Sequence, residues 1–221
     1  MRSPFSPFYF FFFIGLLLWI VFSIKLELIT LTFEKLGLDP GSALMLMATS
    51  LFGSAINLPL GSVKAERPPE PPQLPFPGLL RPPPIPFTGR TQIAVNVGGG
   101  LVPLFFSIYL LRHSEIPLLT LLLAILIVAI VAYWFSRPIP GFGIGMPILI
   151  APLTAALTAI LLGGEYKAPL AYIAGTLGVL IGADLLRIGD IRRMGTPIAS
   201  IGGAGTFDGI FMTGLVAVLL T

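Results

Sequence analysis

Two aspartates, Asp184 and Asp208, are the residues in this sequence whose type and position best suit chemistry. Both fall within long apolar stretches, where a carboxyl group is costly to keep unless it has a role. Two carboxyl groups in different surroundings can hold opposite protonation states, so that one activates a water molecule while the other donates a proton. The pair therefore makes acid–base hydrolysis the first chemistry to consider.

The positions of the two aspartates on their helices favour opposite protonation states. Asp184 lies near the end of an expected helix, where the helix dipole favours the neutral acid unless Arg187, three residues later, compensates. Asp208 follows a glycine-rich stretch and would begin a new helix, which favours its carboxylate form. A plain ion pair between Asp184 and Arg187, and a capping role for Asp208, are the structural alternatives.

Amide, hydroxyl and glycine residues form a second set of candidates, which we expect to bind the substrate. The glycines at 202–205 are predicted to break the last helix, and a broken helix in a membrane requires protein or water to satisfy its freed backbone groups. We expect a polar cavity here, open to the cytoplasm. The candidate binding residues are Asn57, Asn96, Gly202, Gly203, Gly205, Thr206 and Gly209.

Several other kinds of site are excluded by composition. The chain has no cysteine and one histidine, His113, so we expect no metal site and no cofactor. Its 13 basic and 10 acidic residues are too evenly balanced and too scattered for a nucleic-acid-binding surface, so no nucleic-acid partner is expected.

The elements that must position these residues are membrane helices. Of the 221 residues 55% are hydrophobic and only 10% are charged, with a mean hydropathy of +0.96, whereas soluble domains carry about 25% charged residues. Lipid offers no hydrogen-bond partners to the backbone, so the sequence predicts an all-α polytopic membrane helix bundle with at least one broken glycine-rich helix. The chain is read as one integral-membrane domain, 1–221, in contact with membrane lipids. The seven predicted spans are 6–24, 42–60, 92–111, 117–136, 144–162, 168–186 and 197–220.

The loops between these spans predict an orientation. The longest, 61–91, holds ten of the 22 prolines, and we expect a polyproline-like cytoplasmic loop without helix or sheet. Nine Lys and Arg residues fall on the side of this loop and of the N-terminus, against four on the other side. Basic residues favour the cytoplasm, so the N-terminus is expected inside the cell, the C-terminus outside, and the protein in the plasma membrane.

Three stretches, 51–59, 96–99 and 200–211, are similar to those of a prokaryotic family of multi-pass membrane proteins known as a domain of unknown function. The likeness extends over most of the chain from Leu51 onward, includes the run Gly-Gly-Ala-Gly-Thr-Phe-Asp-Gly-Ile-Phe, and implies no defined activity. More loosely, the segments that end in Asp184 and Asp208 resemble aspartyl intramembrane proteases of the presenilin and prepilin-peptidase type. Those enzymes place two aspartates near the cytoplasmic side, the second in a G-x-G-D motif that this chain only approximates, and no Pro-Ala-Leu motif follows Asp208.

Three functions remain open from the sequence. The first is an intramembrane hydrolase, such as a protease, with a membrane protein or peptide as its substrate and Asp184 and Asp208 as its catalytic residues. The second is a small transporter or channel for a cation or polar solute, held at broken helices. The third is a membrane scaffold that presents the proline-rich loop. Whether the protein is an enzyme and whether it forms a homo-oligomer also stay open.

Overall fold

Helices make up most of the described chain, which covers residues 27–66, 89–139, 143–203 and 209–221 of a computed structural model. Two segments, Val97–Leu101 and Leu180–Leu185, are π-helices that adjoin α3 and α6 respectively. A short helix at 27–35 is followed by α2 (Pro40–Gly53), α3 (Val102–His113), α4 (Leu118–Phe135), α5 (Ile150–Leu162), α6 (Lys167–Val179), α7 (Ile191–Met194) and α8 (Gly209–Leu219).

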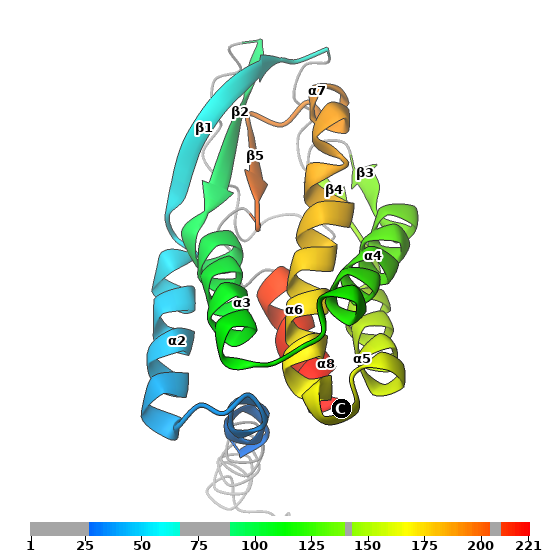
Figure 1. The fold of residues 1–221 in the computed structure, drawn as a ribbon. Helices are drawn as coiled ribbons and strands as arrows, with labels where there is room; N and C mark the ends of the chain where they lie inside the picture. The colour runs from blue at the N-terminus through cyan, green and yellow to red at the C-terminus, as the bar shows by residue number, and fades with distance from the viewer. Residues whose placement is uncertain (1–26, 67–88, 140–142, 204–208) are drawn as a thin grey trace, which may run out of the picture.

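Helix α6 lies at the centre of the bundle, and α3, α4, α5 and α8 pack around it (Figure 1). Its side chains from Leu170 to Thr176 are all buried. Gly178 on α6 and Gly182 in its π-helical extension face α4. A Cβ added at Gly178 would meet Val128 and the Ala129 backbone, and one added at Gly182 would meet the Ala129 backbone. Two glycines four residues apart thus let the two helices approach closely.

Two helical stretches are long and apolar enough to cross a membrane, by length and composition. They are Leu118–Phe135 and the continuous stretch Gly164–Met194, which includes α6 and its π-helical extension. The other apolar helices in the described ranges are shorter, at 10–17 residues. The structure therefore supports a mostly helical protein with two candidate spans rather than the full set of seven, and the predicted span 6–24 lies outside the described residues.

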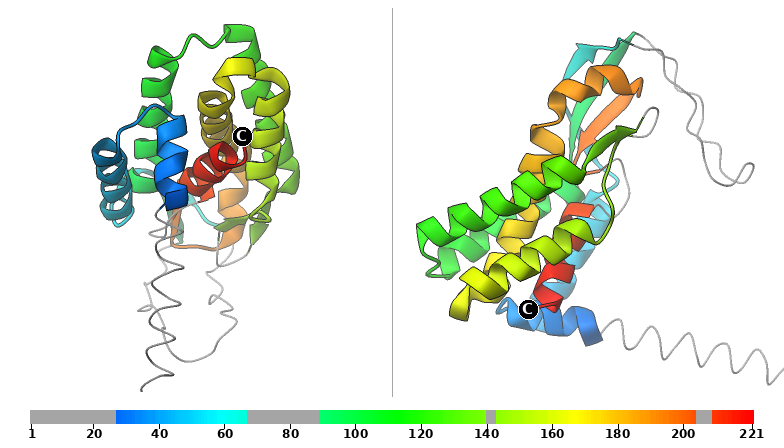
Figure 2. Two further views of the ribbon diagram at one scale, coloured as in Figure 1. Left: turned by 90° about the horizontal axis from the view of Figure 1, so that it is seen from below. Right: turned by 90° about the vertical axis from the view of Figure 1, so that its right-hand side faces the viewer.

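A three-stranded sheet stands at one end of the bundle, beyond α2 and α3 and beside α7 and the π-helical extension of α6 (Figures 1 and 2). Its strands are β1 (Asn57–Lys64), β2 (Arg90–Asn96) and β5 (Ile198–Ile201), in the order β1-β2-β5. β1 pairs with β2 antiparallel, with an irregularity between Pro59 and Gly61, and β2 pairs with β5 parallel. A small hairpin at the same end consists of β3 (Arg137–Ile139) and β4 (Gly143–Gly145).

The sheet corrects the prediction that every element is a helix. The predicted span 42–60 is helical only as far as Gly53, and strand β1 begins at Asn57. The predicted span 92–111 likewise starts as strand β2, and its helical part begins at Val97. Short apolar runs have no periodicity that separates a strand from a helix, and here pairing between distant segments decides in favour of the strand.

The remaining boundaries are corrected in the same way. The segment 61–91 is not entirely a loop, since Gly61–Lys64 belongs to β1 and Arg90 and Thr91 belong to β2, while 67–88 lies outside the described residues. In the predicted span 144–162 the helix begins only at Ile150. In the predicted span 197–220 the part before Gly202 is strand β5 and α8 begins at Gly209, so the predicted broken helix is a strand followed by a helix.

The start of α2 is as the sequence predicts. Asp39 is the N-cap, with its Oδ1 accepting hydrogen bonds from the backbone N–H groups of Gly41 at 2.9 Å and Ser42 at 3.1 Å. Pro40 occupies the first helical turn, where its missing N–H costs nothing.

Candidate functional site

Asp184 lies in the π-helical segment that continues α6 towards the sheet, and its carboxylate contacts a turn on another part of the chain. Its Oδ2 accepts a hydrogen bond from the backbone N–H of Gly202 at 3.0 Å. Gly202 directly follows β5, and both Gly202 and Gly203 have positive φ angles, of 79° and 88°. The carboxylate is therefore held against the point where the chain leaves strand β5.

The backbone at Gly202 lies directly against a second glycine-containing segment, the π-helix Val97–Leu101. A Cβ added to Gly202 would come within 2.5 Å of the backbone nitrogen of Gly100. Gly98, in the same π-helix as Gly100, packs on the end of α2, where an added Cβ would collide with the backbone of Ser50 and Ser54. Three backbone segments thus meet at van der Waals contact, and side chains larger than hydrogen would separate them.

Two predicted binding residues, Asn57 and Asn96, contact each other beside this crossing. Asn96 is fully buried, and its Nδ2 donates to the carbonyl of Ser54 at 2.7 Å and to Oδ1 of Asn57 at 3.1 Å. Its own Oδ1 accepts from the backbone N–H of Gly99 at 2.8 Å. The Asn96 side chain therefore caps the π-helix at Val97–Leu101 and joins β1, β2 and the end of α2, with both of its N–H donors and its carbonyl oxygen bonded.

Asn57 differs from Asn96 because it is exposed. Its Oδ1 accepts from Asn96 and also from the hydroxyl of Ser200 on β5, at 2.6 Å. Ser200 was not among the residues singled out from the sequence, and no local pattern marks it, since its partner lies 143 positions away. The chain of Asn96, Asn57 and Ser200 runs across all three strands at their bundle end.

Arg187 is anchored away from Asp184. Its guanidinium forms an ion pair with Asp190 at 3.2 Å, donates to the carbonyls of Tyr133 and Ser136 at the end of α4, and stacks on the Tyr133 ring at 4.2 Å. The alternative in which Arg187 pairs with Asp184 is therefore wrong. Arg187 instead joins the end of α6 to the end of α4.

The remaining predicted site residues divide between described and undescribed positions. Gly203 lies at the crossing, and Gly209 is the first described residue of α8. Gly205, Thr206 and the second predicted catalytic residue, Asp208, fall within 204–208, outside the described residues. In the four described ranges, no group of three or more acidic or histidine side chains could hold a metal ion.

Comparison with known proteins places the chain in a family. The family described as "Protein of unknown function (DUF1614)" matches residues 51–220, which is more than half of the chain. No curated protein and no solved structure matches significantly. The matched region begins in α2 and includes the sheet, the glycine crossing, Asp184 and the segment of Asp208. The chain therefore belongs to the DUF1614 family of proteins of unknown function.

Proposed function

We propose that this is a multi-pass plasma-membrane protein whose sheet end faces the cytoplasm. The outward faces of the helices support this placement, because large apolar side chains there are exposed and would contact lipid. α4 is the clearest case, with a hydropathy of 2.8 and only 28% of its residues buried. Exposed apolar side chains on α2, α4 and α5 include Leu44, Met45, Phe52, Leu118, Leu119, Leu122, Leu126, Leu157 and Leu161.

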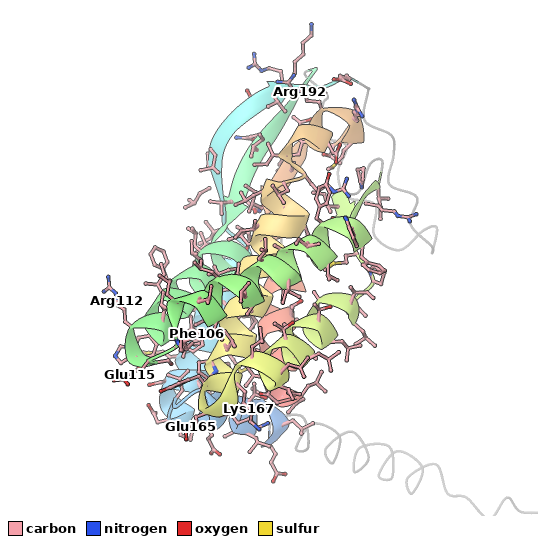
Figure 3. All side chains as sticks on the ribbon, turned by 45° about the vertical axis from the view of Figure 1, so that its right-hand side comes forward. Phe106, Arg112, Glu115, Glu165, Lys167 and Arg192 are labelled. Atoms are coloured by element: carbon pink, nitrogen blue, oxygen red, sulfur yellow. The ribbon has the colours of Figure 1, made fainter. Side chains whose placement is uncertain are left out.

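The distribution of charge supports the orientation. Figure 3 labels Arg192 at the sheet end and Arg112, Glu115, Glu165 and Lys167 towards the opposite end. Among the described residues, the elements of the sheet end carry six basic and two acidic side chains outside the site: Lys64, Arg90, Arg137, Arg187, Arg192, Arg193, Glu66 and Asp190. The opposite end carries three basic and five acidic side chains: Lys35, Arg112, Lys167, Glu27, Glu34, Asp39, Glu115 and Glu165. An excess of basic residues favours the cytoplasmic side.

The activity that we propose is hydrolysis within the membrane, with Asp184 and Asp208 as the acid–base pair and a membrane protein or peptide as substrate. The observation that carries the proposal is the hydrogen bond from the Gly202 N–H to the Asp184 carboxylate. It holds Asp184 against the glycine segment that reaches Asp208 six residues later. A regular helix from Pro197 would have carried Asp208 about 16 Å away from the level of Asp184, and the strand and turn replace that helix.

The second candidate function is transport of a cation or polar solute. It is favoured by the meeting of irregular backbone segments, since the two π-helices and the Gly202–Gly203 turn all lie at one level. Interrupted helices whose backbone groups face a common point are the usual construction of transporter binding sites. In this reading Asp184 binds the transported cation rather than a proton in catalysis.

One comparison separates the two functions. The purified protein is reconstituted into liposomes as wild type, Asp184→Asn and Asp208→Asn, and is assayed for cleavage of membrane-spanning peptides and for cation flux. Loss of an acid–base group reduces catalysis by about 100-fold or more, so we expect both variants to lose cleavage by at least that factor. Asp190→Asn serves as a matched control, because Asp190 lies at the same end but pairs with Arg187.

The other outcomes have defined meanings. Flux that depends on Asp184, without cleavage, would replace the hydrolase by the transporter. Wild-type behaviour of both aspartate variants in both assays would leave the scaffold function. Cleavage that is lost equally in the Asp190→Asn control would point to damaged structure rather than to a catalytic pair.

A further inference from the structure

Two buried hydroxyl groups of the helix bundle lie near each other, yet neither makes a hydrogen bond of ordinary geometry to the described residues. They belong to Tyr172 and Thr176 on α6, and both side chains are fully buried. Burying a hydroxyl without a hydrogen bond destabilises the folded state, because the group loses its bonds to water. Two such groups, one helical turn apart, need a physical explanation.

The two side chains pack against α3 and α8. The Tyr172 ring packs edge-on against Phe106 of α3, with ring centroids 4.9 Å apart. On the other side lies Gly214 of α8, where an added Cβ would be 2.9 Å from both the Thr176 hydroxyl oxygen and the Tyr172 ring. Gly214 thus brings the α8 backbone against both Thr176 and the Tyr172 ring.

Thr176 does not use the hydrogen bond that threonine ordinarily makes in a helix. Thr154 on α5 donates its hydroxyl to the carbonyl of Ile150 at 2.7 Å, four residues earlier. The corresponding carbonyl for Thr176 is that of Tyr172, and the Thr176 hydroxyl makes no such bond. An added Cβ at Gly214 would lie 2.9 Å from the Thr176 hydroxyl oxygen, so this hydroxyl lies next to the α8 backbone.

We propose that Tyr172 and Thr176 form a binding site for ordered internal water between α3, α6 and α8. A buried water typically makes about three hydrogen bonds to polar groups that would otherwise be unsatisfied, and it can donate to or accept from both hydroxyls. Tyr172 lies 12 residues before Asp184, or about 18 Å along the helix axis, so this water is separate from the aspartate site. The proposed water then lies inside the helix bundle, away from the aspartate site.

This inference does not depend on the proposed hydrolase, and its test uses water itself as the probe. Of the five tyrosines, Tyr9, Tyr109, Tyr133 and Tyr166 are replaced by phenylalanine, so that Tyr172 is the only one left. The full-length protein, labelled with ¹³C at the tyrosine Cζ and held in lipid bilayers, is studied by water-edited solid-state NMR. A second variant that retains only Tyr133, which is exposed, gives the rate of transfer for a hydroxyl in contact with water.

We expect the rate at which magnetisation is transferred from water to the Tyr172 signal to lie within twofold of the rate for Tyr133. A build-up more than tenfold slower, matching that of buried methyl groups, would mean a dry site and would overturn the proposal.

A stability measurement on single variants gives an independent answer. If water bridges the hydroxyls, Tyr172→Phe and Thr176→Val each remove a hydrogen bond and lower the midpoint of thermal unfolding. The midpoint of the double variant then falls by less than the sum of the two single shifts, because both variants act on the same water. If the hydroxyls are dry, each change removes an unsatisfied group and leaves the midpoint unchanged or raised. Thr154→Val is the control for loss of a threonine hydroxyl that bonds within its own helix.

Discussion

The side chain of Asn96 illustrates how a polar residue in an apolar sequence can be structural rather than ligand-binding. Its amide is buried, and both its nitrogen and its oxygen already bond to the protein. A substrate could reach these groups only by displacing the Ser54 carbonyl or the Gly99 N–H. Of the two asparagines, Asn57 is therefore the one whose exposed side chain remains accessible.

We predict that Asn96→Ala strongly destabilises the protein. The change leaves the Ser54 carbonyl and the Gly99 N–H buried without partners, and each unsatisfied group costs about 1 to 3 kcal/mol. The thermal midpoint in detergent, followed by intrinsic fluorescence, should fall by several degrees. Asn57→Ala, which affects an exposed side chain, should cause a clearly smaller shift, and equal shifts would contradict the structural role given to Asn96.

Asp39 provides a prediction that depends on pH. The Ser42 hydroxyl donates to its carboxylate at 2.6 Å, and this bond, together with backbone bonds at the start of α2, lowers the pKa of Asp39 below its ordinary value. A lowered pKa in the folded state means that the carboxylate contributes stability above the unfolded-state pKa, near 3.9, and loses it as the pH falls through the folded-state value. The difference in unfolding midpoint between wild type and Asp39→Asn should be present at pH 6 and shrink towards pH 3.

A midpoint difference that stays constant between pH 6 and pH 3 would show that the cap acts without its charge. Glu115→Gln is a suitable control, because Glu115 is an exposed carboxyl on the same end of the molecule.

At the scale of elements, the glycine crossing determines how α2, the π-helix before α3 and the turn after β5 fit together. Gly98 meets the backbone of α2, and Gly202 meets the backbone of Gly100. Neither contact involves the end of a flexible side chain, so neither can relax by changing a rotamer. The position of Gly202, and with it the hydrogen bond to Asp184, therefore depends on backbone contacts between residues about 100 positions apart.

We predict that Gly98→Ala lowers the thermal midpoint and weakens the proposed activity together. The added methyl group would collide with the backbone of Ser50 and Ser54, so α2 or the π-helix must shift. Overpacking of this kind costs about 1 to 3 kcal/mol. Gly61→Ala is the matched control, since an added Cβ at Gly61 meets nothing within 4 Å, and a similar loss in both variants would rule out the crossing as the cause.

Pairing between distant strands explains why two predicted membrane helices begin or end as strands. Val95 and Leu58 lie in apolar runs that satisfy the length test for a membrane helix, yet they pair directly as neighbours on β2 and β1. The one proline and the one glycine of β1, Pro59 and Gly61, are tolerated because β1 is an edge strand with an irregularity between them. No window of local hydropathy contains this pairing, since the partner strand is more than 30 residues away.

At the scale of the whole molecule, the two ends differ in charge and in architecture, and the proposed orientation makes a direct prediction. The chain has no cysteine, so single cysteines can be introduced without background. In inverted and right-side-out vesicles, a membrane-impermeant thiol reagent should label Gly189→Cys from the cytoplasmic side and Glu115→Cys from outside. Both positions are exposed, and an added Cβ at Gly189 meets nothing within 4 Å. The reverse pattern of labelling would invert the topology.

The features that depend on neighbouring residues can be predicted from the amino-acid sequence. These are the apolar helices, the Asp39 cap of α2, and the close approach to α4 at Gly178 and Gly182. Each follows from local conformational preference or from spacing along one helix, which a reader of the sequence can evaluate.

The features that depend on distant partners become visible in the three-dimensional fold and cannot be predicted from local sequence. These include the pairing of β1, β2 and β5, the bonds that join Asn96, Asn57 and Ser200, and the contact of Asp184 with Gly202. It also decided that Arg187 pairs with Asp190, because the α4 carbonyls fix where the guanidinium lies. The physical reason is that a buried polar group takes whichever partner the fold brings within hydrogen-bonding distance, and sequence spacing does not specify that partner.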